Sequence, residues 1–193
     1  MGVVKLIRPR RFGDDRGWFS ETWSARASER LGLPTEFIQD NHSLSRPAWT
    51  LRGLHFQVPP HAQAKLVRCV RGRIWDVAVD VRSGSPTFGK WVGAELSPEN
   101  GSQLFVPVGF AHGFLTFEPD TEVEYKVTDF YSPECDGGLI WDDPDLAVGW
   151  PLAGVSPILS PKDVVLPRLA DFRSPFGYDG EPLTPLEPEP LVP

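Results

Sequence analysis

The chain has 193 residues and a formal net charge of −7, a length that suits one domain with a substantial core and a charge that argues against nucleic acid or an anionic membrane as a partner. Its two cysteines, Cys69 and Cys135, are too few for a disulfide framework and suit a reducing compartment. The N-terminus has no long apolar segment, and no run of residues is long enough to span a membrane. We therefore expect a cytoplasmic protein.

Short segments rich in β-branched and aromatic residues alternate with turns of Gly, Pro and Asp along most of the chain. We expect strands at residues 3–7, 18–23, 37–44, 51–57, 65–70, 74–81, 90–96, 103–107, 111–117, 122–128 and 138–141. Residues 65–70 and 74–81 are expected to pair as a hairpin around Arg71 and Gly72. The sequence therefore predicts an all-β fold, a sandwich or jelly-roll barrel.

Signals for helices are few. Ser24 is a suitable N-cap and Gly32 a suitable stop for one short helix between them. Ser160 followed by Pro161 is typical of a second helix start. We therefore expect the β-fold to carry only a few short helices.

We expect residues 1–180 to form a single domain. From Glu181 onward the chain is rich in proline and has no aromatic residue. That composition favours an extended or disordered segment. We therefore expect residues 181–193 to be a tail that lies outside the fold.

Residues 51–68 bring several chemically versatile side chains close together in the sequence. Arg52, His55, Gln57 and Lys65 all lie in this stretch. A guanidinium, an imidazole and an ammonium group near one another can bind an anion, accept a proton and stabilise an oxyanion. The alternative is that Arg52 and Lys65 are solvated strand charges and that His55 is a core histidine.

Strict alternation along residues 51–57 places His55 and Gln57 on one face and Arg52 on the other. For Arg52 and His55 to share one site, the strand has to bend between them. Gly53 stands between them and can host a β-bulge. A bulge at Gly53 is therefore a condition for a site that uses both side chains.

Alternation also leaves two questions open in later strands. Asp76 and Asp80 share one face of residues 74–81. They either lie on a solvated outer face, or one of them faces a polar barrel interior and orients His55. Tyr125 lies on the apolar face of residues 122–128, where a core tyrosine most often bonds a backbone carbonyl.

Residues 101–112 have the form G-x5-P-x-G-x2-H and end at His112. This pattern looks like the second motif of the cupin jelly roll. The first cupin motif usually carries an H-x-H metal pair, and here the corresponding residues are His55 and Gln57. A transition-metal site normally needs at least three nitrogen or oxygen ligands. The missing second histidine therefore predicts a site that works without a metal.

Several further motifs extend this likeness to one family. They are RGLHFQ at 52–57, KLVRC at 65–69, DVAVD at 76–80, SPTFG at 85–89, PVGFAHGF at 107–114 and LSPKD at 159–163. Over about residues 3–167 the chain resembles dTDP-4-dehydrorhamnose 3,5-epimerases, metal-free cupin-like enzymes of dTDP-L-rhamnose biosynthesis. The resemblance implies an isomerase that inverts C3 and C5 of dTDP-4-dehydro-6-deoxy-D-glucose without a metal or another cofactor.

The resemblance also implies catalytic roles for four residues. His55 corresponds to the general base and Asp163 to its carboxylate partner. Lys65 corresponds to the lysine beyond the loop, and Tyr125 to the tyrosine that acts as an acid. In such chemistry an imidazole removes a proton α to the C4 ketone, a cation stabilises the enolate oxygen, and an acid returns a proton to the opposite face.

The same resemblance implies a set of substrate contacts and a homodimer. The implied contacts are Phe12, Arg16, Phe19, Glu21, Gln39, Asn41, Arg52, His112, Phe130 and Tyr131. The segment from Phe12 to Glu21 is implied to reach the site of the neighbouring subunit. Arg52 is implied to contact phosphate, which would let a chain of net charge −7 bind a dianion. Many relatives have Tyr-Tyr where this chain has Phe130 and Tyr131, so the first hydroxyl is missing here.

Three alternatives remain open at this stage. The first is an epimerase specific for C3 or C5 alone, or a ketoisomerase on a related sugar. The second is a metal-dependent cupin that uses His55 and His112, which a metal assay of the purified protein distinguishes. The third is a sugar-nucleotide binding module without catalysis, against which the set of four catalytic residues argues.

Overall fold

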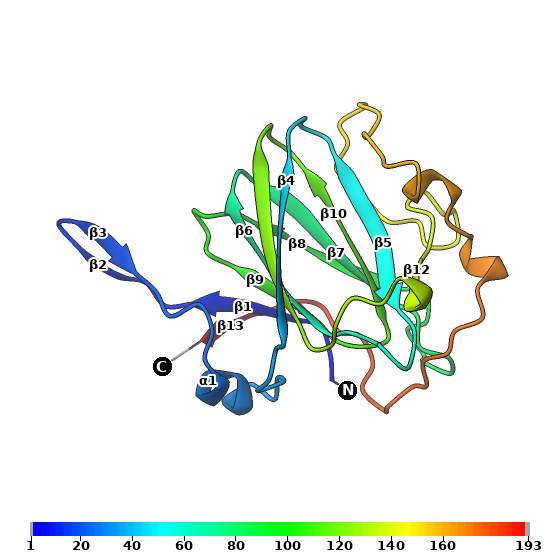
Figure 1. Cartoon of the computed structure of the whole chain (residues 1–193), viewed down its shortest axis with the longest axis horizontal. Helices are drawn as coiled ribbons and strands as arrows, with labels where there is room; N and C mark the ends of the chain where they lie inside the picture. The colour runs from blue at the N-terminus through cyan, green and yellow to red at the C-terminus, as the bar shows by residue number, and fades with distance from the viewer. Residues whose placement is uncertain (1, 192–193) are drawn as a thin grey trace.

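The computed structural model describes residues 2–191, and its two β-sheets face each other as a jelly roll (Figure 1). The six-stranded sheet has the order β13-β1-β9-β6-β11-β4, with β1 (Lys5–Pro9), β4 (Gln39–Ser45), β6 (Lys65–Arg71), β9 (Gln103–Val106), β11 (Thr121–Val127) and β13 (Pro188–Leu191). The five-stranded sheet has the order β12-β5-β10-β7-β8, with β5 (Leu51–Gln57), β7 (Ile74–Asp80), β8 (Trp91–Leu96), β10 (Phe110–Thr116) and β12 (Asp136–Gly138). The predicted all-β jelly roll is confirmed.

The remaining elements are short. A small hairpin is formed by β2 (Phe12–Asp14) and β3 (Gly17–Phe19), and the helices are α1 (Ala25–Arg30) and the single 3-10 turns η1 (Pro133–Cys135), η2 (Asp163–Val165) and η3 (Leu169–Asp171). The N-cap of α1 is Ser24, whose side chain accepts a hydrogen bond from the backbone N–H of Ala27, as predicted. No helix among the described residues is long and apolar enough to cross a membrane.

Apolar side chains from both sheets form the central core. Val67 and Cys69 of β6 meet Ile74 and Ala78 of β7 in this layer. A second apolar cluster covers the outer face of the five-stranded sheet, where Leu54 packs with residues from the C-terminal third of the chain. The outward side chains of this sheet are therefore buried as well, and both cysteines are free buried thiols.

The predicted hairpin of β6 and β7 is wrong. β6 pairs with β9 and β11 in one sheet, while β7 pairs with β8 and β10 in the other. The chain crosses between the sheets at Gly72, where the backbone has φ +76° and Thr121 leaves no room for a Cβ. Alternation indicates the apolar face of each strand, but two strands that face each other across a core have the same pattern as a hairpin.

Three other expected elements are shorter or shifted. The strand expected at 18–23 ends at Phe19, because its partner β2 has only three residues. The strand expected at 138–141 is β12, which begins at Asp136 and pairs with β5. The helix expected to begin at Ser160 is only the single turn η2, although the hydroxyl of Ser160 still accepts a hydrogen bond from the backbone N–H of Asp163.

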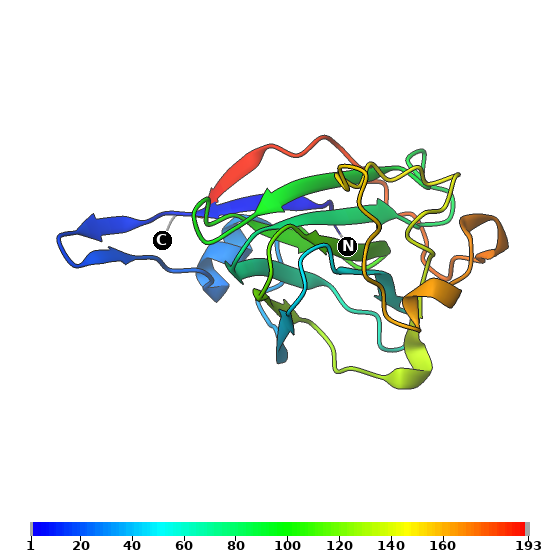
Figure 2. The same ribbon diagram turned by 90° about the horizontal axis from the view of Figure 1, so that it is seen from above.

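The C-terminal segment at residues 181–191 does not lie outside the fold. β13 pairs in parallel with β1, and Figure 2 shows the two strands side by side. Leu191 is buried beneath α1, and Leu183 and Leu186 pack against the central core. The tail pairs with the edge of β1 and covers apolar side chains of the core. The composition of the tail alone does not show that these partners exist.

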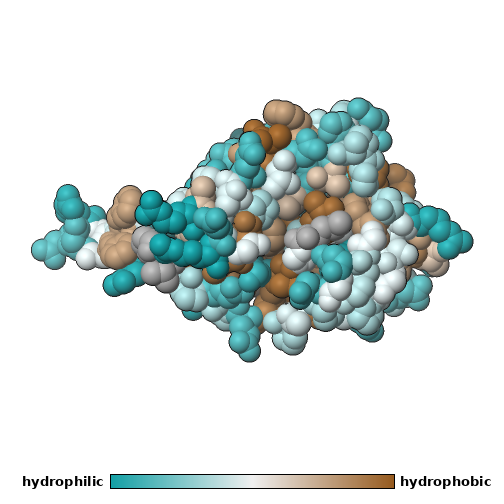
Figure 3. All heavy atoms as spheres, turned by 90° about the horizontal axis from the view of Figure 1, so that it is seen from below, coloured by the Kyte–Doolittle hydropathy of each residue, from teal (hydrophilic) through white to brown (hydrophobic). Residues whose placement is uncertain are grey.

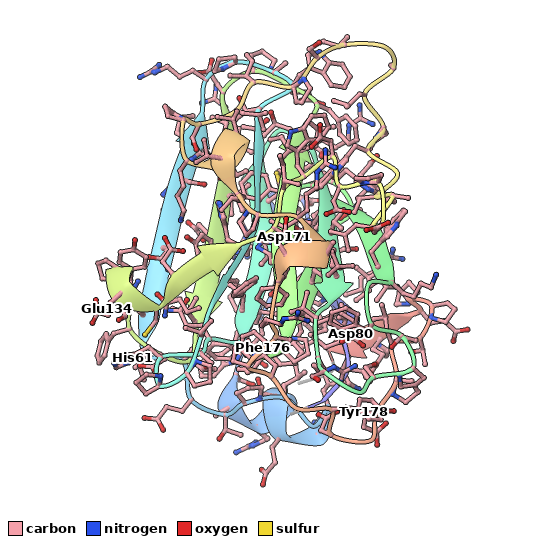
Figure 4. The ribbon with its side chains drawn as sticks, turned by 90° about the vertical axis from the view of Figure 1, so that its right-hand side faces the viewer. His61, Asp80, Glu134, Asp171, Phe176 and Tyr178 are labelled. Carbon is pink, nitrogen blue, oxygen red and sulfur yellow. The ribbon has the colours of Figure 1, made fainter. Side chains whose placement is uncertain are left out.

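Residues 172–180 fix the tail to one end of the barrel. Asp80, Phe176 and Tyr178 lie together at this end (Figure 4). The fully buried guanidinium of Arg82 pairs with both Asp80 and Asp179 and lies over the ring of Tyr178. A buried arginine therefore has its charge balanced partly by the barrel and partly by the segment that leads into the tail.

Deletion of residues 181–193 should lower the free energy of unfolding in urea by about 3 kcal/mol, because three partly or fully buried leucines are lost and each full burial contributes roughly 1.5–3 kcal/mol. The control is Glu189→Gln, which removes only the ion pair with Lys5 and should change the free energy by less than about 1 kcal/mol. Equal stability of the truncated and intact chains would show that the tail does not contribute to the fold.

Candidate active site

The space between the two sheets contains a cavity of about 460 Å³, a size typical of ligand pockets, which span roughly 300–1,000 Å³. Six of the predicted site residues line it: Arg52, His55, Lys65, His112, Tyr125 and Asp163. A second cavity of about 300 Å³ shares His55, Lys65, Tyr125 and Lys162 with the first, so the two cavities adjoin. The structure thus brings residues from four strands and one distant turn into a single site.

His55 and Asp163 form a hydrogen-bonded pair in this site. The distance between Nε2 of His55 and Oδ1 of Asp163 is 2.6 Å. Burial raises the pKa of Asp163, but the hydrogen bond and charge of His55 outweigh burial and leave this pKa below its usual value. The ionised carboxylate fixes the orientation of the ring, and Nδ1 of His55 makes no hydrogen bond to any described residue.

The bulge at Gly53 is present and brings Arg52 to the side of His55. The pairing register of β5 with β10 shifts between His112 and Phe114, which face His55 and Arg52 respectively. Gly53 has φ +131°, and a Cβ there would lie 2.5 Å from the Cα of Gly113. Only glycine fits this backbone position, and the shift lets both Arg52 and His55 face the cavity.

Lys65 supplies a cation whose charge is easily lost. It begins β6, and its Nζ donates a 3.3 Å hydrogen bond to the backbone carbonyl of His55. Burial lowers the pKa of Lys65 to about 8, although the negative charges of Asp76 and Asp136 act in the opposite direction. Lys65 is therefore largely protonated at neutral pH and neutral well above pH 8.

Tyr125 reaches the cavity from β11 in the opposite sheet. Burial raises the pKa of its phenol, so the hydroxyl keeps its proton at neutral pH. Tyr125 is not a core tyrosine that bonds a backbone carbonyl. Its hydroxyl makes no hydrogen bond to any described residue, and its ring lines both cavities. A neutral phenol across the cavity from a histidine is a suitable proton donor.

Asp76 and Asp80 neither lie on a solvated outer face nor orient His55. Both carboxylates are fully buried, so the solvated outer face is wrong. Asp76 faces the interior but orients His112, with 2.7 Å between Oδ1 and Nε2 of the ring, and Asp80 pairs with Arg82. Burial lowers the pKa of His112, with the charge of Asp76 acting against this effect.

The second cavity contains the predicted polar contacts. Gln39 and Asn41 line it from β4, and their side chains hydrogen-bond each other at 2.8 Å. Tyr131 lines the same cavity, and its hydroxyl lies 3.3 Å from Oδ2 of Asp136. The neighbouring ring of Phe130 is 60% exposed and lines neither cavity.

Besides Phe130, four predicted residues lie away from both cavities of their own chain. Phe12, Arg16 and Phe19 belong to the β2–β3 hairpin, which projects from the body of the molecule (Figure 3). The rings of Phe12 and Phe19 are 43% and 70% exposed, and Arg16 pairs only with Asp14 among the described residues. At the base of this hairpin Glu21 accepts a hydrogen bond from the hydroxyl of Ser24. Within one chain, this projecting hairpin therefore takes no part in either cavity.

Gln57 occupies the position of the second metal histidine of a cupin and has a different function here. Its side-chain amide donates to the carbonyls of His61 and Phe130 and accepts from the backbone N–H of Ser132. The side-chain amide of Gln57 therefore links the backbone at His61 to the backbone at Phe130 and Ser132. Among the described residues no three His, Cys, Asp or Glu side chains are arranged as a metal site requires.

Sequence reasoning missed some residues that support the site. The hydroxyl of Ser45 accepts a hydrogen bond from Nε of Arg52 and holds the guanidinium beside β4. Lys162 lines both cavities and forms an ion pair with Asp136. Lys162 was visible as the neighbour of Asp163 in the LSPKD motif, whereas nothing in the sequence around Asp136, the first residue of β12, indicated a partner for Lys162.

Comparison with known proteins gives a consistent result. Residues 2–171 match a family model described as dTDP-4-dehydrorhamnose 3,5-epimerase. An enzyme of that name from Sinorhizobium fredii is 55% identical over 91% of this chain and 89% of its own length. The crystal structure of the Bacillus anthracis enzyme, with TDP and pyrophosphate bound, is 52% identical with a TM-score of 0.83 and covers 86% of this chain and 94% of its own. A Legionella pneumophila structure in complex with dTDP-4-keto-L-rhamnose is 44% identical with a TM-score of 0.86, over 92% and 94% of the two chains.

Gly53→Ala should disrupt both the fold and the site, because a Cβ at this position collides with backbone atoms of β10. We expect a loss of unfolding free energy of about 3 kcal/mol or more, at the upper end of the range for a residue forced into a strained conformation. Gly154→Ala is the control, since Gly154 also has positive φ but open space around it, and the loss should be about 1 kcal/mol. Thermal unfolding of both variants measures this, and equal losses would contradict the importance of the bulge.

Proposed function

The chain belongs to the dTDP-4-dehydrorhamnose 3,5-epimerase family, and we propose that His55, Asp163, Lys65 and Tyr125 carry out its reaction. It is an isomerase that converts dTDP-4-dehydro-6-deoxy-D-glucose to dTDP-4-dehydro-L-rhamnose by inverting C3 and C5, a step of dTDP-L-rhamnose biosynthesis. The observation that carries the assignment of the residues is the 2.6 Å contact of His55 with Asp163 inside a cavity that Lys65 and Tyr125 also line.

His55 is the base for both carbon centres. The hydrogens on C3 and C5 are each α to the C4 ketone, so removing either one leaves an enolate. The proton moves to Nδ1 of His55, because Nε2 is engaged with Asp163, and the electron pair of the C–H bond moves to the C4 oxygen. The charge of Asp163 stabilises the imidazolium that forms and keeps the ring in one orientation.

Lys65 stabilises the negative charge on the C4 oxygen. The protonated form is required for this, and the low pKa of about 8 reflects how little water solvates the ammonium group. A preorganised cation in a poorly hydrated site is worth roughly 3–4 kcal/mol in the transition state. Lys65 therefore supplies a large part of the barrier reduction, provided that it keeps its proton.

Tyr125 returns a proton to the face opposite His55. The two side chains come from different sheets and line the same cavity, so the sugar ring fits between them. Donation to carbon collapses the enolate to the ketone and leaves a phenolate, which regains a proton from solvent. His55 loses its proton to solvent in the same way, so the pair is ready for the second centre.

The nucleotide end of the substrate binds at the mouth of the site. Arg52 contacts phosphate, and Gln39, Asn41 and Tyr131 contact the remainder of the nucleotide from the second cavity. The negative charge of the chain as a whole makes this local arginine necessary for binding of a dianion. His112, whose ring is held by Asp76, lines the same cavity and contacts the sugar.

The working molecule is a homodimer with shared sites in the cytoplasm. Support for the dimer comes from the β2–β3 hairpin, which projects from its own chain with exposed Phe12 and Phe19 and with Arg16 at its tip. In the dimer this hairpin reaches the partner's cavity, where Arg16 adds a second positive charge near the pyrophosphate. The free thiols of Cys69 and Cys135 suit a reducing compartment.

The roles of His55 and Tyr125 are separated by proton exchange in deuterated water. His55→Asn should abolish deuterium incorporation at both C3 and C5, because neither Lys65 nor Arg52 is a base at neutral pH. Tyr125→Phe should still incorporate deuterium but invert poorly, most of all at C5, since the proton returns to the face of His55. NMR of dTDP-4-keto-6-deoxyglucose incubated with each variant measures both quantities.

Two results would contradict these roles. Continued exchange with His55→Asn would place the base on another residue. Full inversion with Tyr125→Phe would assign the acid role to water or to Tyr131, which lines the adjoining cavity.

The value of kcat/KM should fall as the pH rises through about 8, because Lys65 loses its proton there and with it the charge on the C4 oxygen. Below that pH the charged form predominates, and Tyr125, whose pKa is raised, keeps its proton in the same range. Lys65→Arg should be slower, but its decline should move to higher pH, because a guanidinium does not deprotonate. The same basic limb in both proteins would assign it to another group.

Sharing of sites is tested by mixing two inactive variants, Arg16→Ala and His55→Asn. If the hairpin crosses, a mixed dimer has one site with both substitutions and one site with neither. Activity of a subunit-exchanged mixture should recover to about one quarter of wild type, because half the dimers are mixed and each contributes one intact site. Complete exchange, verified by mass spectrometry, without recovery of activity would refute a shared site.

A further inference from the structure

The segment that carries Asp163 has little structure of its own. Asp163 is buried, whereas Pro161, Val164 and Val165 around it are exposed. Its internal hydrogen bonds are few: the N–H of Asp163 bonds the carbonyl of Ser160 at 3.0 Å and the hydroxyl of Ser160 at 3.2 Å, and the N–H of Val165 bonds the carbonyl of Lys162 at 3.3 Å. An exposed loop of this kind does not fix a buried carboxylate by apolar packing.

Fixed points lie on both sides of this loop. Before it, the carbonyl of Ile158 accepts a hydrogen bond from the N–H of Leu51, and after it Pro167 bonds Ile140. Between these fixed points, residues 159–165 make two side-chain hydrogen bonds to the rest of the described chain. One joins Asp163 to His55, and the other joins Lys162 to Asp136.

The partner of Lys162 stands on the strand beside the base. Asp136 begins β12, which follows the one-turn helix of Glu134 (Figure 4). β12 pairs with β5 so that Gly138 faces His55. The ion pair thus ties the loop that carries Asp163 to β12, the strand beside His55. His55 and Asp163 are therefore linked through this ion pair as well as through their own hydrogen bond.

Asp136 also connects this tie to the cavity wall. Its Oδ2 lies 3.3 Å from the hydroxyl of Tyr131, and its side chain is 15% exposed against 46% for Lys162. Lys162 lines both cavities together with His55, Lys65 and Tyr125. Because Asp136 neutralises Lys162, this lysine is not a free cation for the pyrophosphate, unlike Arg52, which bonds only neutral oxygens of Ser45 and Leu44 among the described residues.

We propose that Lys162, held by Asp136, is a positioning residue that keeps Asp163 in hydrogen-bonding contact with His55 during turnover. The inference rests on the proposed role of His55 and Asp163 in the reaction and deepens it. A partly exposed ion pair contributes little to the free energy of unfolding. A displacement of about 1 Å in a catalytic group can reduce the rate roughly a hundredfold. The pair therefore matters for the rate much more than for stability.

The test compares Lys162→Met, Asp136→Asn and the double variant on dTDP-4-keto-6-deoxyglucose. Each single variant should lower kcat about tenfold and leave KM within about twofold, because an interaction in the reacting state is lost and not one in substrate binding. The double variant should be no slower than either single one, since both remove the same tie. Lys162→Arg should restore most of kcat, because it keeps the ion pair.

Lys5→Met is the matched control, because Lys5 forms a similar partly exposed ion pair with Glu189 far from the site. It should leave kcat unchanged, and its melting temperature should match that of Lys162→Met. Three results would overturn the proposal: unchanged kcat in Lys162→Met, a rise in KM in Lys162→Met that Asp136→Asn does not share, or additive losses in the double variant.

The proposed function and this inference fail in distinguishable ways. If His55→Asn retains exchange at C3 and C5, the base assignment is wrong whatever Lys162 does. If His55→Asn is inactive while Lys162→Met turns over like wild type, the base assignment stands and only the positioning role of Lys162 is wrong.

Discussion

The hydrogen bond between His55 and Asp163 joins two residues that are 108 positions apart in the chain. One partner lies on β5, an inner strand of the five-stranded sheet, and the other lies on an exposed loop that is otherwise tied to the barrel by backbone hydrogen bonds at its two ends and by the ion pair of Lys162 with Asp136. Around this contact, β5 carries the bulge at Gly53 that brings Arg52 to the same cavity, β12 pairs with β5, and the loop is held at both ends by backbone hydrogen bonds. Much of the fold around the cavity can be understood as the set of conditions for this contact.

The cavity combines burial with a few opposed charges. Burial lowers the pKa values of Lys65 and His112 and raises that of Tyr125, so each group is poised nearer to neutrality than it would be in water. The negative charge of Asp76 raises the pKa values of both Lys65 and His112 and so opposes the effect of burial on these two groups. Burial therefore favours the uncharged form of each group, and the nearby carboxylates keep Lys65 largely protonated at neutral pH, as its proposed role at the C4 oxygen requires.

The sequence was most informative where the chemistry is local. Alternation placed Tyr125 on the inner face of its strand, and the glycine at position 53 indicated a bend, whereas the resemblance to the family implied that Asp163 and Tyr125 act together with His55. It was least informative where a residue's partner comes from far away. Gly72 turns the chain from one sheet to the other, and no periodicity separates that corner from a hairpin. Likewise, a proline-rich tail acquires structure from the edge of β1, and Asp136 acquires its role from Lys162.

In the proposed mechanism the sugar ring lies between His55 and Tyr125 with its C4 oxygen toward Lys65. A crystal structure of the protein with dTDP-L-rhamnose, a stable product analogue, tests this most directly. Nδ1 of His55 should lie within about 3.5 Å of C3 or C5, the separation of a reacting pair, and the hydroxyl of Tyr125 should lie on the opposite face of the ring. A sugar bound outside the cavity, or one with His55 and Tyr125 on the same face, would contradict it.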